Sequence, residues 1–196
     1  MALFERRETP GRYADPREYR PFLRRDFRRM CAYCERTEVY LGGEEHFEVD
    51  HFKPTKIATE LKCYYPNLYY ACRKCNQYKS SKWPSDEQVN RGKVFADPCA
   101  EDPYLAHLLE RWDGSLTELT ACGEYTNGHI RLDRADVCEW RRQRQLARNN
   151  LPTWQKLEES LLLALDLPRT NRNEIEQQIE ALRQLMAELK DRFQLV

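Results

Sequence analysis

Two pairs of closely spaced cysteines constrain this chain more than any other feature of its sequence. Cys31 and Cys34 form the first pair, Cys72 and Cys75 form the second, and 37 residues lie between the pairs. Two intervening residues let one turn of backbone bring both thiolates to the same ion, and Zn²⁺ prefers four tetrahedral ligands. Redox CxxC motifs do not usually occur twice in one chain. We therefore expect a structural zinc site that closes a loop around a folded element.

The remaining four cysteines lack this paired spacing. We expect each to be a small buried apolar residue, and no second metal site among them: Cys63, Cys99, Cys122 and Cys138. In a reducing compartment, paired CxxC spacings indicate a metal before they indicate disulfides. No apolar run suits a membrane span or a secretory signal, which predicts a cytoplasmic protein.

The charge balance limits how this chain could bind a polyanion. Its 196 residues contain 32 basic and 32 acidic side chains, so the formal net charge is zero. Proteins that bind nucleic acid by themselves usually carry a basic excess, because binding draws on phosphate neutralisation and counterion release. Any contact with nucleic acid should therefore be local, or shared with a partner.

A set of residues inside and beside the loop is suited to phosphodiester hydrolysis. Asp50 and His51 lie between the two CxxC pairs, and Asn76 directly follows Cys75. His51 titrates near neutrality and suits a general base. Asp50 and Asn76 offer hard oxygen ligands for Mg²⁺ or Mn²⁺. Lys79, three residues further along the same predicted helix, could contact a phosphate.

Three segments together resemble the HNH endonuclease superfamily: CAYCERTEVY, FEVDHFKP and YPNLYYACRKCNQYKSSKWP. The resemblance covers about residues 30–84 and implies a ββα-metal core. By position, His51 resembles the general base and Asp50 a metal ligand. Asn67 resembles the asparagine that braces the loop and helps orient the base, and Asn76 resembles the second metal ligand. The four paired cysteines resemble the structural zinc ligands of many members.

The resemblance also implies a function for the chain. It implies hydrolysis of DNA with 5′-phosphate and 3′-hydroxyl products. The later segments VFADPCAEDPY and GEYTNGHIRLDR resemble bacterial HNH proteins of anti-phage defence, the Septu type, whose relatives act beside an ATPase. Two alternatives stay open: a non-catalytic zinc module that binds nucleic acid or a protein, and an RNA or tRNA nuclease on the same scaffold.

The fold class that we predict is α+β. Four segments are expected, namely an arginine-rich helical segment at residues 1–30, the HNH core at 31–93, a β-hairpin and loop extension at 94–133, and a helical region at 134–196. Strands are expected at 46–52, 67–71, 115–120 and 129–132. Tight turns are expected at the Asp113-Gly114 and Asn127-Gly128 pairs. Helices are expected at 16–30, 72–82, 134–149, 152–166 and 171–193, the last with one apolar stripe.

Several other side chains could serve binding. His46 and Glu48 alternate with Asp50 along a strand, either as partly exposed residues or as a further metal or phosphate contact. A basic stretch surrounds the motif helix, with Tyr78 and Trp83 interleaved: Arg73, Lys74, Lys79, Lys82, Arg91 and Lys93. The arginines of residues 1–30 and of 141–148 are either further phosphate contacts or solvated helix faces. The last helix is expected to pack in the core, or else to form a partner or dimer surface.

Overall fold

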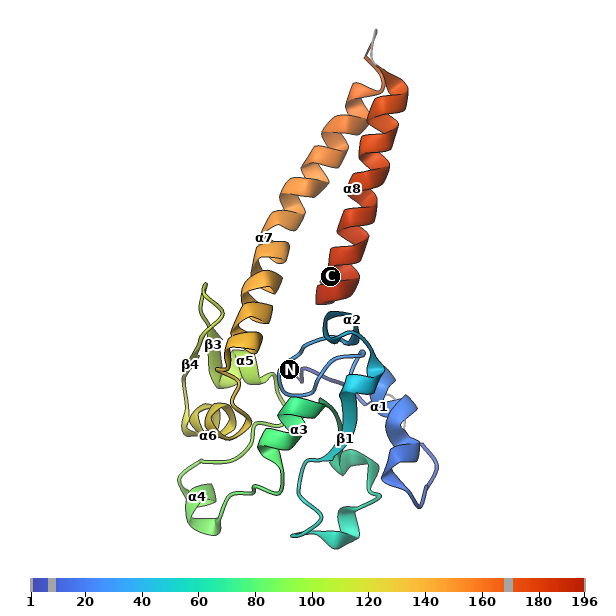
Figure 1. The fold of residues 1–196 in the computed structure, drawn as a ribbon. Helices are drawn as coiled ribbons and strands as arrows, with labels where there is room; N and C mark the ends of the chain where they lie inside the picture. The colour runs from blue at the N-terminus through green and yellow to red at the C-terminus, as the bar shows by residue number, and fades with distance from the viewer. Residues whose placement is uncertain (1, 7–9, 168–170, 196) are drawn as a thin grey trace. The chain divides into compact units, whose positions relative to one another are not determined.

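The computed structural model describes residues 2–6, 10–167 and 171–195, and Figure 1 shows their fold. The chain divides into two compact units, Met1–Arg141 and Arg142–Val196, and each is described by itself. Part of the arginine-rich segment (residues 7–9) and the residues leading into the last expected helix (168–170) lie outside the described residues. None of the helices described combines the length and the hydropathy needed to span a bilayer.

The first unit begins with a short helical stretch that packs on the central sheet. A 3₁₀ turn, η1 (Pro16–Tyr19), leads into α1 (Arg20–Asp26), and Asp15 caps the turn by accepting from the Arg17 backbone amide. Leu23 and Phe27 are fully buried. The helical stretch expected within residues 16–30 is therefore confirmed.

The centre of the first unit is the expected ββα arrangement. Strands β1 (Phe47–His51) and β2 (Leu68–Cys72) pair antiparallel, and α3 (Arg73–Lys79) follows β2 directly. All five residues of β2 are buried, which gives the site a rigid base. Short helices connect these elements: α2 (Glu38–Leu41), η2 (Glu44–His46), η3 (Thr59–Leu61), η4 (Tyr65–Asn67) and α4 (Asp86–Asn90).

A small hairpin forms where the Asp-Gly turn was expected. After α5 (Pro103–Ala106), strands β3 (Leu108–Glu110) and β4 (Leu116–Glu118) pair antiparallel. Gly114 has a φ of +82°, and the Asp113 side chain accepts from the Ser115 amide at 2.9 Å. The turn and the strand near residues 115–120 are therefore confirmed, and the partner strand comes from upstream in the sequence.

The second expected turn and its strand were wrong. Residues 129–132 form no strand in the described structure, and the Asn127-Gly128 pair lies inside helix α6 (Ala121–Ile130). Thr120 begins this helix by accepting from the Gly123 amide at 3.1 Å. Tyr125 and Ile130 of this helix are buried in the core of the first unit. Capping and core burial together outweigh the local turn preference of Asn-Gly.

A single long helix replaces two expected ones. Helix α7 (Ala135–Ala164) runs without interruption from the first unit into the second, with Pro152 inside it. A proline in a helix leaves one carbonyl without its amide partner. Pro152 is exposed, so water can bond that carbonyl. The break expected between residues 149 and 152 was therefore wrong.

The second unit is a pair of antiparallel helices, formed by α7 from Arg142 onward and α8 (Arg172–Phe193) (Figure 1). Ile179, Met186 and Phe193 recur every seven residues along α8 and are buried. On α7, Ala147 and Leu151 are buried as well. The apolar stripe predicted for the last helix therefore serves packing between these two helices.

Candidate metal centre and active site

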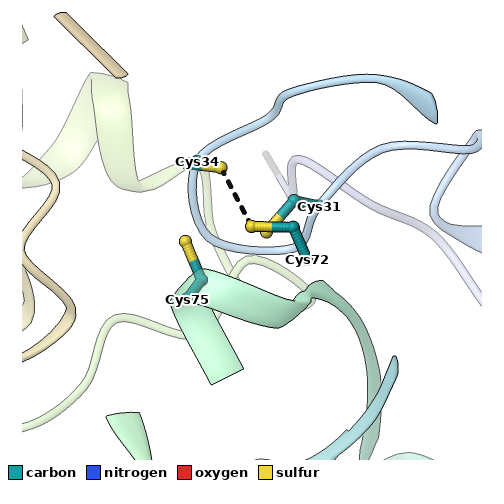
Figure 2. A group of neighbouring side chains, drawn as sticks. All are labelled: Cys31, Cys34, Cys72 and Cys75. Atoms are coloured by element: carbon teal, nitrogen blue, oxygen red, sulfur yellow. Dashed lines mark hydrogen bonds between the residues drawn. The ribbon is translucent and has the colours of Figure 1, made fainter. Parts of the chain in front are cut away.

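The four paired cysteines converge on one buried point (Figure 2). Cys31 and Cys34 come from the turn after α1, Cys72 ends β2, and Cys75 lies in the first turn of α3. Their sulfur atoms all lie within 4.8 Å of one another, and each residue is at most 1% exposed. Zn–S bonds of about 2.3 Å in a tetrahedron place neighbouring sulfurs about 3.8 Å apart. The Sγ atoms of Cys34 and Cys72 are 3.8 Å apart, so this cluster fits zinc.

The other cysteines are spread over the first unit. Cys122 is buried, as expected, but Cys63, Cys99 and Cys138 are only half-buried. The thiols of Cys63 and Cys138 donate to backbone carbonyls at 3.1 and 3.2 Å. The expectation of full burial was therefore wrong for these three residues.

Residues His51 and Asn76 line one hollow at the end of β1. This hollow has a volume of about 240 Å³ and is also bordered by Asp50, Ser80 and Ser81. The Nε2 atom of His51 lies 2.8 Å from the carbonyl oxygen of Lys62. Because a carbonyl can only accept, Nε2 carries the proton and Nδ1 is the nitrogen of the neutral ring that can accept one.

Asn76 is oriented by Glu48, one of the two strand residues left open above. The amide Nδ2 of Asn76 donates to Glu48 Oε2 at 2.8 Å. Since Nδ2 is committed to Glu48, the Oδ1 atom is what Asn76 can offer to a cation. Glu48 also accepts from Arg73 Nε at 3.2 Å. Glu48 and Asn76 are therefore joined by a hydrogen bond, and both border one hollow with His51.

Asp50 is more enclosed than its neighbours and is already bonded. Its side chain is 4% exposed, the Tyr33 hydroxyl donates to Oδ2, and Lys79 Nζ lies 3.0 Å from Oδ2 and 3.2 Å from Oδ1. Burial raises the pKa of Asp50, which the Lys79 charge opposes. Burial likewise lowers the pKa of Lys79.

The family comparison bears on this arrangement. Residues 31–82 match the family model described as HNH endonuclease. This part of the chain is an HNH domain. No curated protein matches the chain. An HNH domain supports a nuclease-type function and implies nucleic-acid binding, and the four-cysteine cluster within it is consistent with zinc.

Asn67 braces the loop of the HNH domain that follows β1. Its Oδ1 accepts from the Lys53 amide at 2.8 Å, and its Nδ2 donates to the Lys53 carbonyl at 3.0 Å. The Asn67 carbonyl also accepts from the Phe52 amide at 2.9 Å. These bonds fix the backbone directly after His51.

Lys79 does not reach the surface of the HNH domain. Its side chain is completely buried, and its ammonium group donates to Asp50 and, at 2.6 Å, to the His51 carbonyl. A phosphate on the surface has no access to this group. The phosphate contact expected of Lys79 therefore does not fit its position, which is that of a support for the Asp50-His51 backbone.

Most of the basic stretch around the motif helix is already paired. Lys74 lies 3.2 Å from Asp136, Arg91 lies 2.7 Å from Glu87, and Lys93 lies 3.1 Å from Glu124. The interleaved Trp83 packs against Phe52 and Phe95. These pairings reduce the net attraction for a phosphate backbone and agree with the zero net charge.

Sequence reasoning missed the residues that surround the motif side chains. Tyr33 lies between the first two cysteines and donates to Asp50, and Arg36 and Arg134 lie beside the cysteine sulfurs. Tyr33 could have been found from the sequence, because a tyrosine between the two cysteines of a CxxC pair must lie close to the residues in the loop that the metal site closes. Arg134 carried none, because 59 residues separate it from Cys75.

Proposed function

We propose that the HNH domain hydrolyses phosphodiester bonds with His51 as the general base. The observation that supports this is the bond between His51 Nε2 and the Lys62 carbonyl, which leaves Nδ1 to take a proton from water. His51 lines the same hollow as Asn76 and Asp50. Asn67 holds the backbone that follows the base.

The same hollow suits a divalent cation. Asn76 Oδ1 and Asp50 are the ligands of this proposal, and such hard oxygens suit Mg²⁺ or Mn²⁺. When bound, the ion would stabilise charge on the phosphate and on the leaving oxygen. Oδ2 of Asp50 is in contact with both Tyr33 and Lys79, whereas Oδ1 accepts from Lys79 alone, so Oδ1 is the oxygen with a lone pair left for the ion.

The proposed substrate is DNA, which the resemblance favours. A second hollow of about 610 Å³ borders His51 and Asn76 and is lined by Arg17 and Arg20 of the N-terminal segment. Asp15 and Glu48 line the same hollow, and Arg17 is paired with Asp15 at 2.6 Å, so the formal charges of its lining balance. We therefore propose that a partner helps to deliver the substrate. An ATPase partner, a role in anti-phage defence and a cytoplasmic location stay predictions from the sequence.

The test is cleavage of plasmid DNA by the full chain with Mg²⁺ or Mn²⁺. We expect wild type to cut, and His51→Ala to lower the rate by at least about 100-fold, since a general base contributes about 10²–10⁴. His107→Gln is the matched control, because His107 bonds Glu101 and Thr120 instead. If His51→Ala cuts as fast as wild type, His51 is not the base.

A parallel assay separates the alternatives. RNA and tRNA are offered under the same conditions, and binding is measured in EDTA. Cleavage of RNA but not DNA would replace the proposed substrate while keeping the chemistry. Binding without cleavage of either polymer would favour the non-catalytic zinc module.

A further inference from the structure

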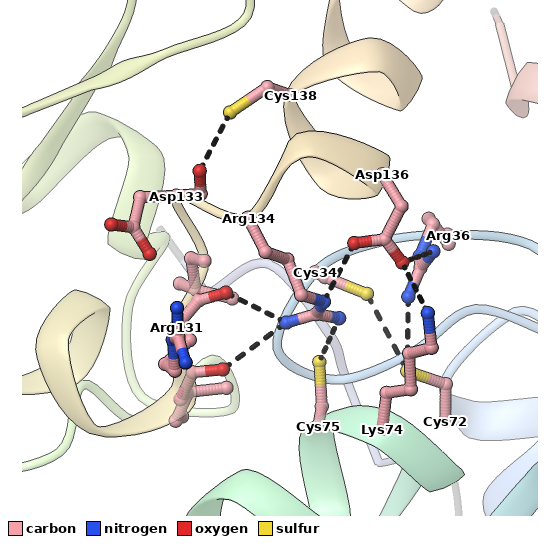
Figure 3. Close-up of polar contacts among 12 residues, drawn as sticks. Cys34, Arg36, Cys72, Lys74, Cys75, Arg131, Asp133, Arg134, Asp136 and Cys138 are labelled. Atoms are coloured by element: carbon pink, nitrogen blue, oxygen red, sulfur yellow. Dashed lines mark hydrogen bonds and ion pairs between the residues drawn. The ribbon is translucent and has the colours of Figure 1, made fainter.

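Two buried arginines lie against the sulfur atoms of the cysteine cluster (Figure 3). The Nη2 atom of Arg134 is 3.1 Å from Cys75 Sγ, and Nη2 of Arg36 is 3.8 Å from Cys72 Sγ. The side chains of Arg36 and Arg134 are 4% and 8% exposed. They come from distant parts of the chain, since Arg36 follows the first cysteine pair and Arg134 directly precedes α7.

Charge explains why two arginines would be buried here. Zinc with four thiolates carries a double negative charge, and an uncompensated charge in a protein interior is costly. Two guanidinium groups cancel that charge, and arginine stays protonated at every physiological pH. An N–H group that donates to a thiolate also withdraws electron density from the sulfur, as other outer hydrogen bonds do at metal sites.

Further contacts hold both arginines in place. Asp136 Oδ2 accepts from Arg36 Nη1 at 2.7 Å, and Asp136 Oδ1 lies 3.1 Å from Arg134 Nε. Lys74 lies 3.2 Å from the same carboxylate and balances its charge. Arg134 Nη1 also donates to the carbonyls of Ile130 and Arg131 at 3.2 and 2.9 Å. Arg134 therefore joins the end of α6, the start of α7 and the cysteine cluster (Figure 3).

We propose that Arg36 and Arg134 form an outer shell of the zinc site: they donate to the thiolates of Cys72 and Cys75, compensate the charge of the zinc–thiolate group and slow the loss of zinc. Asp136 is the positioning residue that aims both guanidinium groups. This assignment concerns zinc retention and does not depend on cleavage of nucleic acid. It therefore stands or falls separately from the nuclease proposal.

The experiment measures zinc affinity and zinc release in the full-length, zinc-loaded protein. A chromophoric chelator competes for the metal in wild type, Arg134→Gln, Arg134→Lys and Asp136→Asn. Loss of an outer hydrogen bond at a metal site typically costs about 10–100-fold in affinity, and we expect that loss for Arg134→Gln. Arg134→Lys should recover part of the lost zinc affinity, because lysine keeps the positive charge but lacks the planar, forked guanidinium group. Asp136→Asn should have a smaller effect.

Two controls separate this role from a purely structural one. Arg91→Gln removes an exposed arginine that pairs with Glu87. Cys138→Ala removes a bond to the Asp133 carbonyl and so perturbs the same α6–α7 turn without touching the cluster sulfurs. We expect both controls to bind zinc as wild type does. Zinc loss in Cys138→Ala equal to that in Arg134→Gln would overturn the proposal in favour of simple loosening of the turn.

A spectroscopic measurement completes the test. Co²⁺ replaces zinc, and the sulfur-to-cobalt charge-transfer band is compared between wild type and Arg134→Lys, or Arg134→Gln where it folds. Weaker N–H donation raises the energy of the sulfur electrons, so we expect the band to move to lower energy. Unchanged spectra together with zinc affinities within about twofold of wild type would show that Arg134 does not act on the thiolates, and would overturn the proposal.

Discussion

The two units of this chain are stabilised by different means. The described part of the first unit buries charged side chains next to apolar ones, among them Asp50, Lys79 and Arg36. In the second unit, the buried residues that join the two helices are mainly apolar, such as Leu151, Ile179 and Met186. The first unit therefore combines an apolar core with buried charged pairs and a cysteine cluster that fits zinc, whereas the two helices of the second unit are joined mainly by apolar side chains.

The buried charges of the first unit hold its candidate catalytic side chains in place. A buried ion pair adds little net stability compared with apolar packing, but it is costly to break. In the HNH domain, Lys79 fixes both the Asp50 carboxylate and the backbone of His51. The cysteine cluster fixes the first turn of α3, and with it Asn76. The polar interior thus holds the candidate catalytic side chains on rigid elements.

Zinc removal should produce the largest difference in stability between the two units. Structural zinc contributes about 10–16 kcal/mol in zinc-finger peptides, which matches or exceeds the typical stability of a domain, about 5–15 kcal/mol. We expect a strong chelator, or Cys75→Ser, to abolish amide protection in β1, β2 and α3. Residues 142–167 and 171–193 should keep their helical protection. Hydrogen exchange read by mass spectrometry measures both, and persistent protection of β2 without metal would contradict a structural role for zinc.

Breaking the buried ion pair should have the next largest effect. Lys79→Met leaves the Asp50 carboxylate buried without its cation, which costs about 3–5 kcal/mol. The double variant Asp50→Leu with Lys79→Met should be markedly more stable than Lys79→Met alone, because no charge is left uncompensated. Urea unfolding with zinc held in excess measures both values. Equal stabilities for the single and double variants would show that an uncompensated Asp50 carboxylate is not what destabilises Lys79→Met.

How far the sequence predicted this molecule also differs between regions. The cysteine spacing predicted a zinc site and the residue pattern predicted two strands and a helix, because metal geometry and strand pattern both act locally, while the family resemblance implied the ββα core. The Asn127-Gly128 turn was wrong because burial of Tyr125 and Ile130 decides the helix. The break at Pro152 was wrong because an exposed proline can remain within a long helix. Local preference yields to tertiary packing in the first case, and to solvation of the freed carbonyl in the second.

The residues of the candidate site also differ in how well the sequence could predict them. The identities of His51, Asn67 and Asn76 could be inferred from order along the chain, but the surroundings of Asp50 could not. Enclosure by Tyr33 and Lys79 depends on how α3 and the first cysteine turn pack around β1. The link from Arg134 to Cys75 spans 59 residues. Contacts between residues so far apart in the sequence can be found only from the folded structure and not from the motif.

A core substitution in the second unit should have a moderate and local effect. Ile179→Ala removes a buried side chain from α8, and such truncations cost about 2–5 kcal/mol, with the lower end expected for a two-helix pair open to solvent. Amide hydrogen exchange should become faster in residues 171–193 and stay unchanged in β1 and β2. The exposed Leu185→Ala is the matched control on the same helix, for which we expect a smaller change. Faster exchange in β2 would show that the units are stabilised together.

The smallest effect should come from the surface ion pair between the two helices. Arg183 Nε lies 2.6 Å from Glu158 Oε1, and these side chains are 51% and 20% exposed. Exposed pairs contribute about 0.2–1 kcal/mol and are screened by salt. We expect a double-mutant cycle with Arg183→Gln and Glu158→Gln to give a coupling in this range that shrinks at high ionic strength. The Asp50–Lys79 coupling should barely respond to salt, because both groups are buried. Equal salt sensitivity of the two pairs would mean that water reaches Asp50 in solution. The first unit would then not differ from the second in burying its ion pair away from water.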